Sequence, residues 1–491
     1  MRRYDLVVLG GGTAGLVSSV IAAGAGARVA LVEAERTGGD CLWTGCVPSK
    51  SLIAAGDLAQ RIREGTRLGI AAGDPVVDFA AVRAHIDRAQ AEIEPHDSPE
   101  RLRSVGVEVI EARGAFSAPG ELEVDGQRLG FRAAIVATGS EPVAPAIEGL
   151  SGAEALTSES IWSLSALPAR LAVIGGGPIG CELGQAFSRL GSDVTIVEAG
   201  ERLLEREDPR ASQLVLERLR GEGVRVVTAA VVTKVRPGVF GAGALLIEGG
   251  GRTSAVDYDR LLVAVGRRPR GAGLGLEALG ARVERDGTVA VDERLRTAAR
   301  GIFAAGDVTG APPFTHVAAQ QARIAAPNAL FGTRRRMRYD AVPRVTFTDP
   351  EVASVGLGET DARARWGDRA QIAEYDLAQS DRAITADRAY GFVKLVGDRR
   401  GRLVGATVCG PAAGESIAEL TAWIASGAKI DRVSTTVHAY PTFSEGAARA
   451  ADDYLRQRYA KPLPQTASRA ALAALRVASG LGVTRRSRRG G

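Results

Sequence analysis

This 491-residue sequence has little cysteine, histidine or lysine, with only four, four and five of them. Four cysteines in so long a chain cannot form the disulfide framework of a small secreted protein. They favour a reducing, cytoplasmic setting, in which a disulfide is usually catalytic. No run of 18 uncharged apolar residues occurs, so no membrane-spanning helix is predicted. The apolar run after Arg2 and Arg3 is broken by three consecutive glycines, which argues against a signal peptide.

The excess of basic residues is confined to one end of the chain. Residues 456–491 contain nine Lys or Arg and no acidic residue, which leaves 53 basic and 57 acidic residues for the rest. The main body is therefore mildly acidic despite a sequence pI near 9.1. A body of this charge predicts no basic face for nucleic acid, so a nucleic-acid partner is not expected.

The N-terminal segment carries a dinucleotide-binding pattern. A short apolar strand is predicted at Tyr4–Leu9, then an alanine-rich helix to about Ala27 and a second strand at Val29–Val32. Between the first strand and the helix stands G-x-G-x-x-G, and an acid follows the second strand. Glycines at this turn let the helix N-terminus approach a pyrophosphate, while the acid binds a ribose diol. The residues that carry the pattern are Gly10, Gly12, Gly15 and Glu33.

The same pattern recurs once. Strands are predicted at Leu171–Ile174 and Asp193–Val197, and the glycine turn and the acid keep the same 23-residue spacing. Two such units in one chain imply two dinucleotides, for which a flavin and a nicotinamide are the economical pair. The residues of this second pattern are Gly175, Gly177, Gly180 and Glu198.

The remaining chain divides by composition. Leu261–Arg270 and Gly301–Gly310 are apolar strands that break at a glycine, where a backbone can lie close to a ligand. From about Tyr339 the pattern alternates and predicts an antiparallel sheet, with helices at Ala412–Ser426 and Glu445–Arg456. Other helices are predicted at 51–63 and 79–93, a helix at 469–477 is weakly indicated, and the last ten residues have the composition of a disordered tail.

The stretch Gly38–Lys50, GGDCLWTGCVPSK, contains half of the cysteines. In a regular helix, the Cα atoms of Cys41 and Cys46 would lie roughly 8.6 Å apart, which exceeds the limit of about 7 Å for a disulfide. A bridge therefore requires the backbone to leave the helix, which Gly45 and Pro48 permit. A short, distorted bridge is easily reduced and suits a redox pair. The alternative is two unrelated buried thiols.

Lys50 stands out because the chain has 57 arginines and only five lysines. A composition of this kind uses arginine wherever charge alone suffices. A lysine four residues after Cys46 therefore suggests that a compact ammonium is needed there. The alternative is a solvated surface lysine.

The redox pair, both glycine patterns, Asp307 in AAGD and the C-terminal YPTFSE stand in register. Over about residues 4–455 the sequence resembles the flavin-dependent pyridine nucleotide–disulfide oxidoreductases, which include dihydrolipoamide dehydrogenase, glutathione reductase and mercuric reductase. The resemblance implies an α/β fold with two Rossmann-like dinucleotide-binding domains and a C-terminal α+β dimerisation domain, assembled as a homodimer. The implied bounds are 1–150 and 276–335 for the FAD domain, 151–275 for the NAD(P) domain, 336–458 for dimerisation and 459–491 for a basic, flexible tail.

The resemblance also implies the roles of individual residues. Cys46 is the thiolate beside the isoalloxazine, and Cys41 is the interchange thiol that meets the acceptor. Lys50 lies near flavin N5 and pairs with Glu182 on the second glycine-pattern helix. The residues implied for FAD are Gly10, Gly12, Gly15, Glu33, Lys50, Gly114, Thr138, Gly139 and Asp307, and those for the nicotinamide are Gly175, Gly177, Gly180, Glu198 and Gly266. No resident metal site is expected.

The sequence favours NADH over NADPH. Glu198 offers a carboxylate to a 2′-hydroxyl and would repel a 2′-phosphate. Gly180, in place of alanine, also follows the NAD form of the pattern, whereas the nearby Arg202 could soften the preference.

The sequence departs from the family at its C-terminal signature, where a histidine normally serves as acid–base partner across the dimer. The corresponding residues are Tyr440, Pro441 and Glu445, and His438 lies two positions upstream. A phenol titrates near pH 10, so Tyr440 is a poor proton shuttle at neutral pH. His438 is a candidate to take over the acid–base role from Tyr440, and a core or interface role for this histidine is the alternative.

Tyrosine at this position resembles mercuric reductase, in which thiolates hold a soft metal ion. The C-terminal cysteine pair of those enzymes is missing, because no cysteine follows Cys409. The expected function is thus an FAD-dependent, mercuric-reductase-like oxidoreductase with a metal-ion or small-molecule acceptor. A dihydrolipoamide dehydrogenase-like activity and a quinone reductase with incidental cysteines are the alternatives, and the physiological direction stays open.

Overall fold

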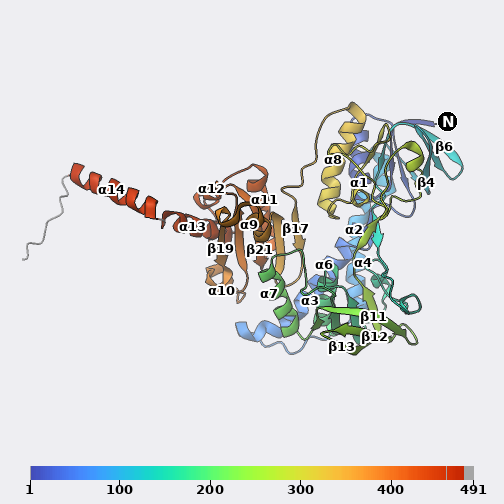
Figure 1. Ribbon diagram of the computed structural model, residues 1–491. Coiled ribbons are helices and arrows are strands. Elements are labelled where there is room, and N and C mark those ends of the chain that lie inside the picture. The colour runs from blue at the N-terminus through green and yellow to red at the C-terminus, as the bar shows by residue number, and fades with distance from the viewer. Residues whose placement is uncertain (1, 461, 480–491) are drawn as a thin grey trace, which may run out of the picture. The chain divides into compact units, whose positions relative to one another are not determined.

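The computed structural model describes residues 2–460 and 462–479, and the chain forms two compact units, 1–352 and 353–491 (Figure 1). Each unit is described by itself. Both combine helices with sheets, which confirms the mixed α/β fold class.

The first sheet of unit 1 has seven strands in the order β3-β2-β1-β6-β5-β4, with β16 beside β6. The strands β1, β2, β3, β6 and β16 run parallel, whereas β5 is antiparallel to both of its neighbours, β6 and β4. The late strand β16 therefore returns to the sheet that the N-terminal segment begins. The strands are β1 (Arg2–Leu9), β2 (Val29–Glu33), β3 (Val107–Glu111), β4 (Gly114–Ala118), β5 (Glu121–Val124), β6 (Gln127–Val136) and β16 (Ile302–Ala304).

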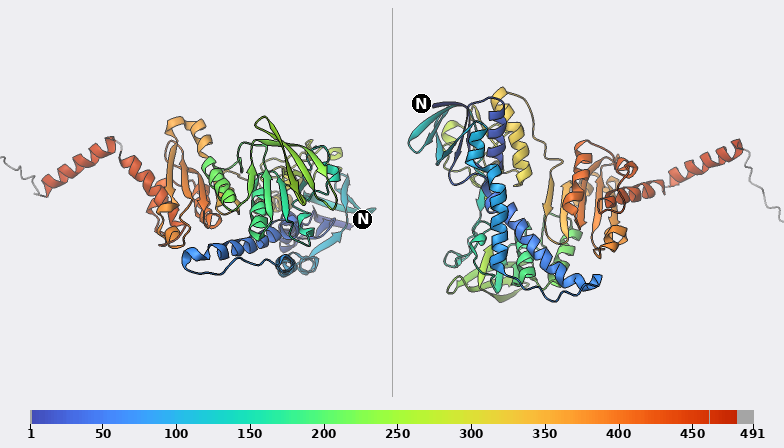
Figure 2. Two further views of the ribbon diagram at one scale, coloured as in Figure 1. Left: turned by 90° about the horizontal axis from the view of Figure 1, so that it is seen from below. Right: turned by 180° about the vertical axis from the view of Figure 1, so that it is seen from behind.

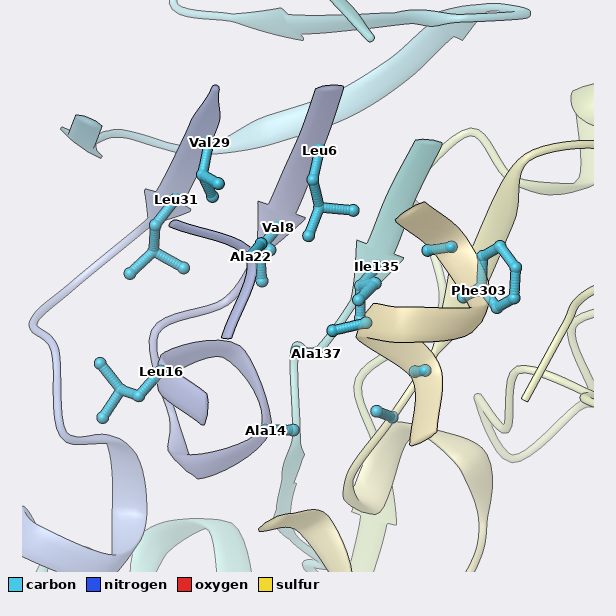
Figure 3. Close-up of a cluster of buried hydrophobic side chains, with 14 of the residues drawn as sticks. Leu6, Val8, Ala14, Leu16, Ala22, Val29, Leu31, Ile135, Ala137 and Phe303 are labelled. Carbon is cyan, nitrogen blue, oxygen red and sulfur yellow. The ribbon is translucent and has the colours of Figure 1, made fainter. Parts of the chain in front are cut away.

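Helices α1 (Thr13–Gly24) and α8 (Thr315–Phe331) pack together against this sheet. The apolar side chains of β1 and β2 alternate between two cores, as parallel strands covered on both faces require. Figure 3 shows one of these cores, in which Leu6, Leu31 and Ile135 from the strands cluster with Leu16 of α1.

The second parallel sheet of unit 1 has the order β10-β9-β8-β14. A three-stranded antiparallel sheet, β11-β12-β13, shares a core with it and was not predicted from the sequence. The strands are β8 (Arg170–Ile174), β9 (Asp193–Val197), β10 (Arg225–Val227), β11 (Ala230–Pro237), β12 (Gly243–Gly249), β13 (Arg252–Tyr258) and β14 (Arg260–Val263), and the helices are α6 (Pro178–Leu190) and α7 (Pro209–Gly221).

Four helices of unit 1 lie between β2 and β3 in the sequence, and α3 and α4 are the two long blue helices in the rear view of Figure 2. The predicted helices at 51–63 and 79–93 are confirmed. Both are longer than predicted, because α3 already begins at Cys46 and α4 continues to Asp97. The remaining elements of unit 1 are α2 (Gly39–Trp43), α3 (Cys46–Glu64), α4 (Phe79–Asp97), α5 (Pro99–Ser104), the paired strands β7 (Ser140–Pro142) and β15 (Arg267–Pro269), β17 (Pro343–Thr346), and the 3-10 turns η1 (Gly65–Leu68), η2 (Leu150–Gly152), η3 (Ile161–Ser163), η4 (Glu277–Leu279) and η5 (Asp307–Thr309).

Unit 2 contains β18, β21, β20 and β19 as neighbours in that order, and β18 spans the boundary between the units. The pairs β19–β20 and β20–β21 are antiparallel, as the alternating sequence pattern predicts. The strands are β18 (Glu351–Gly356), β19 (Gln371–Asp376), β20 (Phe392–Gly397) and β21 (Leu403–Gly410), and the helices and turns are α9 (Glu359–Trp366), η6 (Gly367–Arg369), η7 (Leu377–Gln379), α10 (Asp381–Thr385), α11 (Ala413–Ala425), α12 (Ile430–Thr435), α13 (Glu445–Tyr459) and α14 (Pro462–Ala478).

The C-terminal helix α14 begins seven residues before the helix indicated at 469–477. The predicted disorder of the last ten residues lies outside the described residues. Within the described part of the chain, no helix is both long and apolar enough to span a membrane.

Candidate functional site

The first glycine pattern forms a tight turn between β1 and α1. Gly10 has a positive φ of 109°, and a Cβ on Gly15 would lie 1.8 Å from the carbonyl oxygen of Gly10. Glu33 accepts a hydrogen bond of 2.5 Å from the N–H of Gly11, so the acid closes the turn. No described side chain caps the N-terminus of α1. Its first N–H groups are therefore available to an anionic ligand.

The second glycine pattern repeats this geometry. Gly175 has a φ of 109°, a Cβ on Gly180 would lie 2.0 Å from the Gly175 carbonyl oxygen, and Glu198 accepts a 2.5 Å hydrogen bond from Gly176. Helix α6 also has no side-chain cap among the described residues. Both turns thus satisfy the backbone requirements of a dinucleotide pyrophosphate.

The redox segment starts against the first glycine turn. The N–H of Gly38 donates to the carbonyl oxygen of Gly11, and a Cβ on Gly39 would lie 2.7 Å from the Cα of Gly12. Only glycine allows two backbones to approach this closely. The segment that carries the cysteines is therefore held next to the first nucleotide-binding turn.

The two cysteines lie on different helices, with a break at Thr44 and Gly45 between α2 and α3. The backbone between them therefore leaves the helix, as a bridge between the two cysteines would require. Gly45 is at the break, whereas Pro48 lies in the first turn of α3, where a missing N–H costs nothing. Cys41 and Cys46 are both free thiols in this structure.

Cys46 is the first residue of α3, and its Sγ lies 3.5 Å from the hydroxyl of Thr315, the first residue of α8. The hydrogen bond from the Cys41 thiol, with help from Thr315 and the charge of Lys50, lowers the pKa of Cys46 to about 6. The same hydrogen bond, together with burial, raises the pKa of Cys41 well above its usual range. At neutral pH the pair therefore consists of one thiolate and one thiol.

Lys50 is held from two sides. Its Nζ lies 2.8 Å from Glu182 on α6 and 4.4 Å from the centre of the Phe347 ring. The second carboxylate oxygen of Glu182 accepts the N–H of Phe347 at 2.9 Å. The lysine is thus a fixed positive charge four residues after Cys46, which excludes a freely solvated side chain.

A cavity of about 1680 Å³ brings these groups together. It is lined by both redox cysteines, Lys50, Glu182 and the first glycine turn, and it extends to Pro178 and Ile179 on α6. The predicted residues in its lining are Gly10, Gly12, Glu33, Cys41, Cys46, Lys50, Gly114, Thr138, Gly139, Glu182 and Asp307. Outside the lining lie Gly15, which packs beneath the first turn, and Gly175, Gly177, Gly180, Glu198 and Gly266 of the nicotinamide set.

Arg267 is a central residue of this cavity that the sequence analysis did not single out. Its guanidinium bonds Asp40, Glu159 at 2.8 Å and the Ser140 carbonyl at 2.8 Å. Ser140 in turn donates to Asp307 at 2.6 Å. Arg267 therefore links the redox segment, through Ser140, to Asp307, one of the residues implied for FAD. The only sequence signal is its place in the GRRPR run after the second nucleotide unit.

Burial raises the pKa of Asp40, although the charge of Arg267 opposes the shift. His316, also in the lining, stacks on Phe314 with 5.2 Å between ring centres and contacts the Pro343 carbonyl at 2.8 Å. No local sequence pattern marks Asp40 or His316 as a cavity residue, because their partners lie far away in the chain or in an irregular loop.

Tyr440 belongs to unit 2, where its side chain is 63% exposed and donates a hydrogen bond of 2.5 Å to Asp381. That hydrogen bond and the negative charge of Asp381 raise the pKa of Tyr440. Glu445 pairs with Arg449 at 2.6 Å.

His438 is largely buried, with Nε2 2.9 Å from Glu419 and Nδ1 2.8 Å from the Thr436 carbonyl. Both ring nitrogens are therefore engaged within unit 2, which is the arrangement of a structural histidine.

Cys181 and Cys409 are fully buried. Within the described residues, no group of three or more His, Cys, Asp or Glu side chains is placed to hold a metal ion.

Comparisons with known proteins identify the family of this chain. The pyridine nucleotide-disulphide oxidoreductase model matches residues 4–322, and the dimerisation-domain model of the same family matches residues 342–451. A mercuric reductase from Streptomyces lividans is 37% identical over 458 residues, covering 92% of this chain and 96% of that protein. A dihydrolipoyl dehydrogenase from Thermus scotoductus is 36% identical over 461 residues, covering 93% and 98%.

A solved structure shows the same fold. The HOCl-induced flavoprotein disulfide reductase RclA from Escherichia coli, in a Cu(II) complex, aligns with a TM-score of 0.82 and 27% identity, covering 92% of this chain and 99% of that one. Members of this family are FAD-dependent enzymes that use NAD(P)H. The two uncapped glycine turns fit the pyrophosphates of these cofactors, and the cavity beside the first turn fits the flavin. The chain therefore belongs to the pyridine nucleotide-disulphide oxidoreductases and is a flavoprotein oxidoreductase with the dimerisation domain of that family.

Proposed function

We propose that this enzyme passes electrons from NADH through the Cys41–Cys46 pair to a soft metal ion such as Hg(II). FAD, held at the first glycine turn, would supply the two-electron carrier between the nicotinamide and the cysteine pair. With Hg(II) as acceptor the balance is simple, because NADH gives two electrons and one proton, and the metal leaves as Hg(0). The proposal extends to a homodimer in the cytoplasm, with domain bounds of 1–150 and 276–335, 151–275, and 336–458.

The residues of the chain have distinct tasks in this scheme. Cys46, with its lowered pKa, remains a thiolate near neutral pH, and Lys50 holds a positive charge beside it. Cys41 keeps its proton until a partner takes it, which suits the thiol that meets the acceptor. The pairing of β16 with β6 supports an FAD domain assembled from two chain segments.

The observation that carries the choice of acceptor is Tyr440. The family uses a histidine at this position to protonate a thiol leaving group, whereas the hydrogen bond to Asp381 raises the pKa of the Tyr440 phenol and makes it a still poorer proton donor at neutral pH. Its hydroxyl proton is also directed to Asp381. His438 offers no replacement, because both of its ring nitrogens have partners. A metal ion held by thiolates requires no such proton, so this acceptor class is favoured.

The preference for NADH has further support in the loop after β9. Both carboxylate oxygens of Glu198 accept backbone N–H groups, from Gly176 and Gly200, which keeps the carboxylate in place to meet a ribose diol. Arg202 donates to the carbonyl oxygens of Glu205 and Glu207. An arginine committed to its own loop is a poor ligand for the 2′-phosphate of NADPH.

A dihydrolipoyl dehydrogenase-like activity is the second candidate, favoured by the 36% identity to the Thermus scotoductus enzyme. A direct quinone reductase is the third. Steady-state turnover with NADH and NADPH, using Hg(II), lipoamide, glutathione disulfide and a quinone as acceptors, separates the three.

We expect Hg(II) reduction to be fastest with NADH and to be abolished in Cys41→Ala and Cys46→Ser. We also expect the reduced enzyme to show the long-wavelength absorbance of a thiolate beside a flavin, which Cys46→Ser loses. Faster turnover with lipoamide than with Hg(II) would reject the metal acceptor, and full quinone turnover in Cys41→Ala would favour the third candidate.

A further inference from the structure

Helix α3, which begins at Cys46, carries a row of charged side chains that point to α6 and α7. Lys50, Asp57 and Glu64 are spaced by seven residues, or two helical turns, and share one face. Lys50 pairs with Glu182 on α6, Asp57 with Arg189 on α6, and Glu64 with Arg218 on α7 at 2.9 Å. We call these three ion pairs the α3 seam. Only the first is at the redox site.

The facing side of α6 is polar and almost fully buried. Glu182, Gln185 and Arg189 recur at spacings of three and four residues, with residue exposures of 7%, 3% and 3%. Polar side chains at such positions need partners, since an unpaired buried group costs free energy. Each of these three side chains has a hydrogen-bond or ion-pair partner in the segment after β17.

That segment, Phe347–Asp349, is fastened to α6 along its length. The N–H of Phe347 donates to Glu182 at 2.9 Å, and the N–H of Asp349 donates to the Gln185 side-chain oxygen at 2.8 Å. The Gln185 amide returns a 2.9 Å bond to the Asp349 carbonyl, and the Asp349 carboxylate lies 2.9 Å from Arg189. Phe347 also provides the ring under Lys50. The position of the lysine thus depends on how this segment sits on α6.

Arg189 is the group that joins the seam to the segment. Its guanidinium contacts three carboxylates: Asp57 on α3, Glu222 at 2.6 Å just after α7, and Asp349. A planar fork with five donors meets three carboxylates at once, which a lysine ammonium cannot match. Buried ion clusters of this kind are weak contributors to stability compared with apolar packing, so a role in fixing geometry is the more informative explanation.

We propose that Arg189 is a positioning residue for the redox site, holding α3 and the Phe347–Asp349 segment on α6 so that Lys50 stays between Glu182 and the Phe347 ring. The proposal rests on the proposed function, in which Lys50 stabilises the Cys46 thiolate. Arg189 acts through Lys50 and touches neither cofactor nor acceptor. The positive charge of Lys50 helps to lower the pKa of Cys46, so a displaced lysine would leave the thiolate less stable.

The test uses Arg189→Met and the milder Asp57→Asn, which removes the negative charge of one ion pair at a half-exposed residue. Lys50→Met is the second site of a double-mutant cycle. Arg170→Met is the matched control, because it breaks an ion pair with Asp259 at the start of β8, away from α3 and α6. For each purified holoenzyme, the pH midpoint of the long-wavelength thiolate band, the rate of NADH oxidation and the thermal midpoint are measured.

We expect Arg189→Met and Asp57→Asn to move the thiolate midpoint to higher pH by about half a unit and to lower turnover roughly threefold. These are the effects expected when the ion pair between the partly exposed Lys50 and Glu182 is weakened. In the Lys50→Met background the same substitutions should shift the midpoint no further. Arg170→Met should leave both values unchanged.

An unchanged midpoint in folded Asp57→Asn would overturn the proposal, and so would equal shifts with and without Lys50. If Arg189→Met does not fold, Asp57→Asn alone decides. Failure of the proposed function is separate, because it appears in the unsubstituted enzyme as a missing thiolate band or as turnover that survives Cys46→Ser.

Discussion

At the scale of single residues, the site separates the two thiols by their surroundings. Cys46 lies at a helix N-terminus, receives hydrogen bonds from Cys41 and Thr315, and faces Lys50, and all of these favour the thiolate. Cys41 is half-buried and keeps its proton. The family resemblance implied different roles for the two cysteines, and their surroundings in the structure give a physical cause for the difference.

The lowered pKa of Cys46 predicts the pH dependence of the reduced enzyme. Because the thiol is acidic, the thiolate predominates above about pH 6 and is lost as the pH falls through that value. The long-wavelength band should follow the same titration. Thr315→Val should move its midpoint to higher pH, because the hydroxyl that stabilises the thiolate is removed, whereas Thr435→Val on the surface of α12 should not. A band midpoint near pH 9 in the unsubstituted enzyme would contradict the prediction.

Tyr440→His tests the reason for the choice of acceptor. An imidazole titrates near neutrality and can protonate a leaving thiol, so lipoamide turnover should rise about tenfold or more. Reduction of Hg(II) should change little, since it requires no proton at that position. Tyr440→Phe serves as the control and should not gain lipoamide activity. Equal lipoamide turnover in all three proteins would show that Tyr440 does not limit this reaction.

At the scale of secondary-structure elements, each glycine turn depends on a close approach between its first and third glycines. The approach is short enough that a single methyl group would separate helix from turn. The sequence pattern predicts this correctly, because glycine spacing reports local backbone geometry. The break between α2 and α3 is the one that the cysteine spacing required for a bridged pair, and Gly45 lies at it.

Gly15→Ala should therefore abolish or strongly reduce FAD retention, because its Cβ would overlap the Gly10 carbonyl oxygen. Gly24→Ala, at the end of the same helix, is the control. A Cβ there meets no atom within 4 Å, and alanine should stabilise the helix by roughly 0.5–1 kcal/mol. Flavin content per chain and the thermal midpoint measure both effects. Normal flavin content in Gly15→Ala would disprove the role of this turn.

At the scale of the whole molecule, the chain combines a large unit that carries the redox cavity with a smaller one that belongs to the dimerisation family. The excess positive charge lies beyond both functional regions, in residues 456–491. Helix α14 within this stretch is exposed along all of its described side chains. None of the residues that line the cavity belongs to this helix.

Deletion of residues 461–491 should thus leave turnover within about twofold and preserve the dimer. The truncated chain loses seven basic residues, so its formal net charge changes from +5 to −2 and it should no longer bind a cation exchanger at neutral pH. Sedimentation and NADH oxidation assays on the truncated and full-length chains check this. A monomeric or inactive product would assign the tail a structural role.

The sequence by itself determined the two glycine turns and singled out the cysteine pair and Lys50 as candidates, because each of these depends on residue identity and spacing within a short segment. The tertiary structure alone decided which groups surround them. Thr315 meets Cys46 across 269 residues, and Arg267 meets Asp40 across 227. Arg189 gathers carboxylates from three separate elements, and the Tyr440 proton is directed to Asp381. Contacts of this kind arise only when packing brings distant segments together, so no local pattern records them.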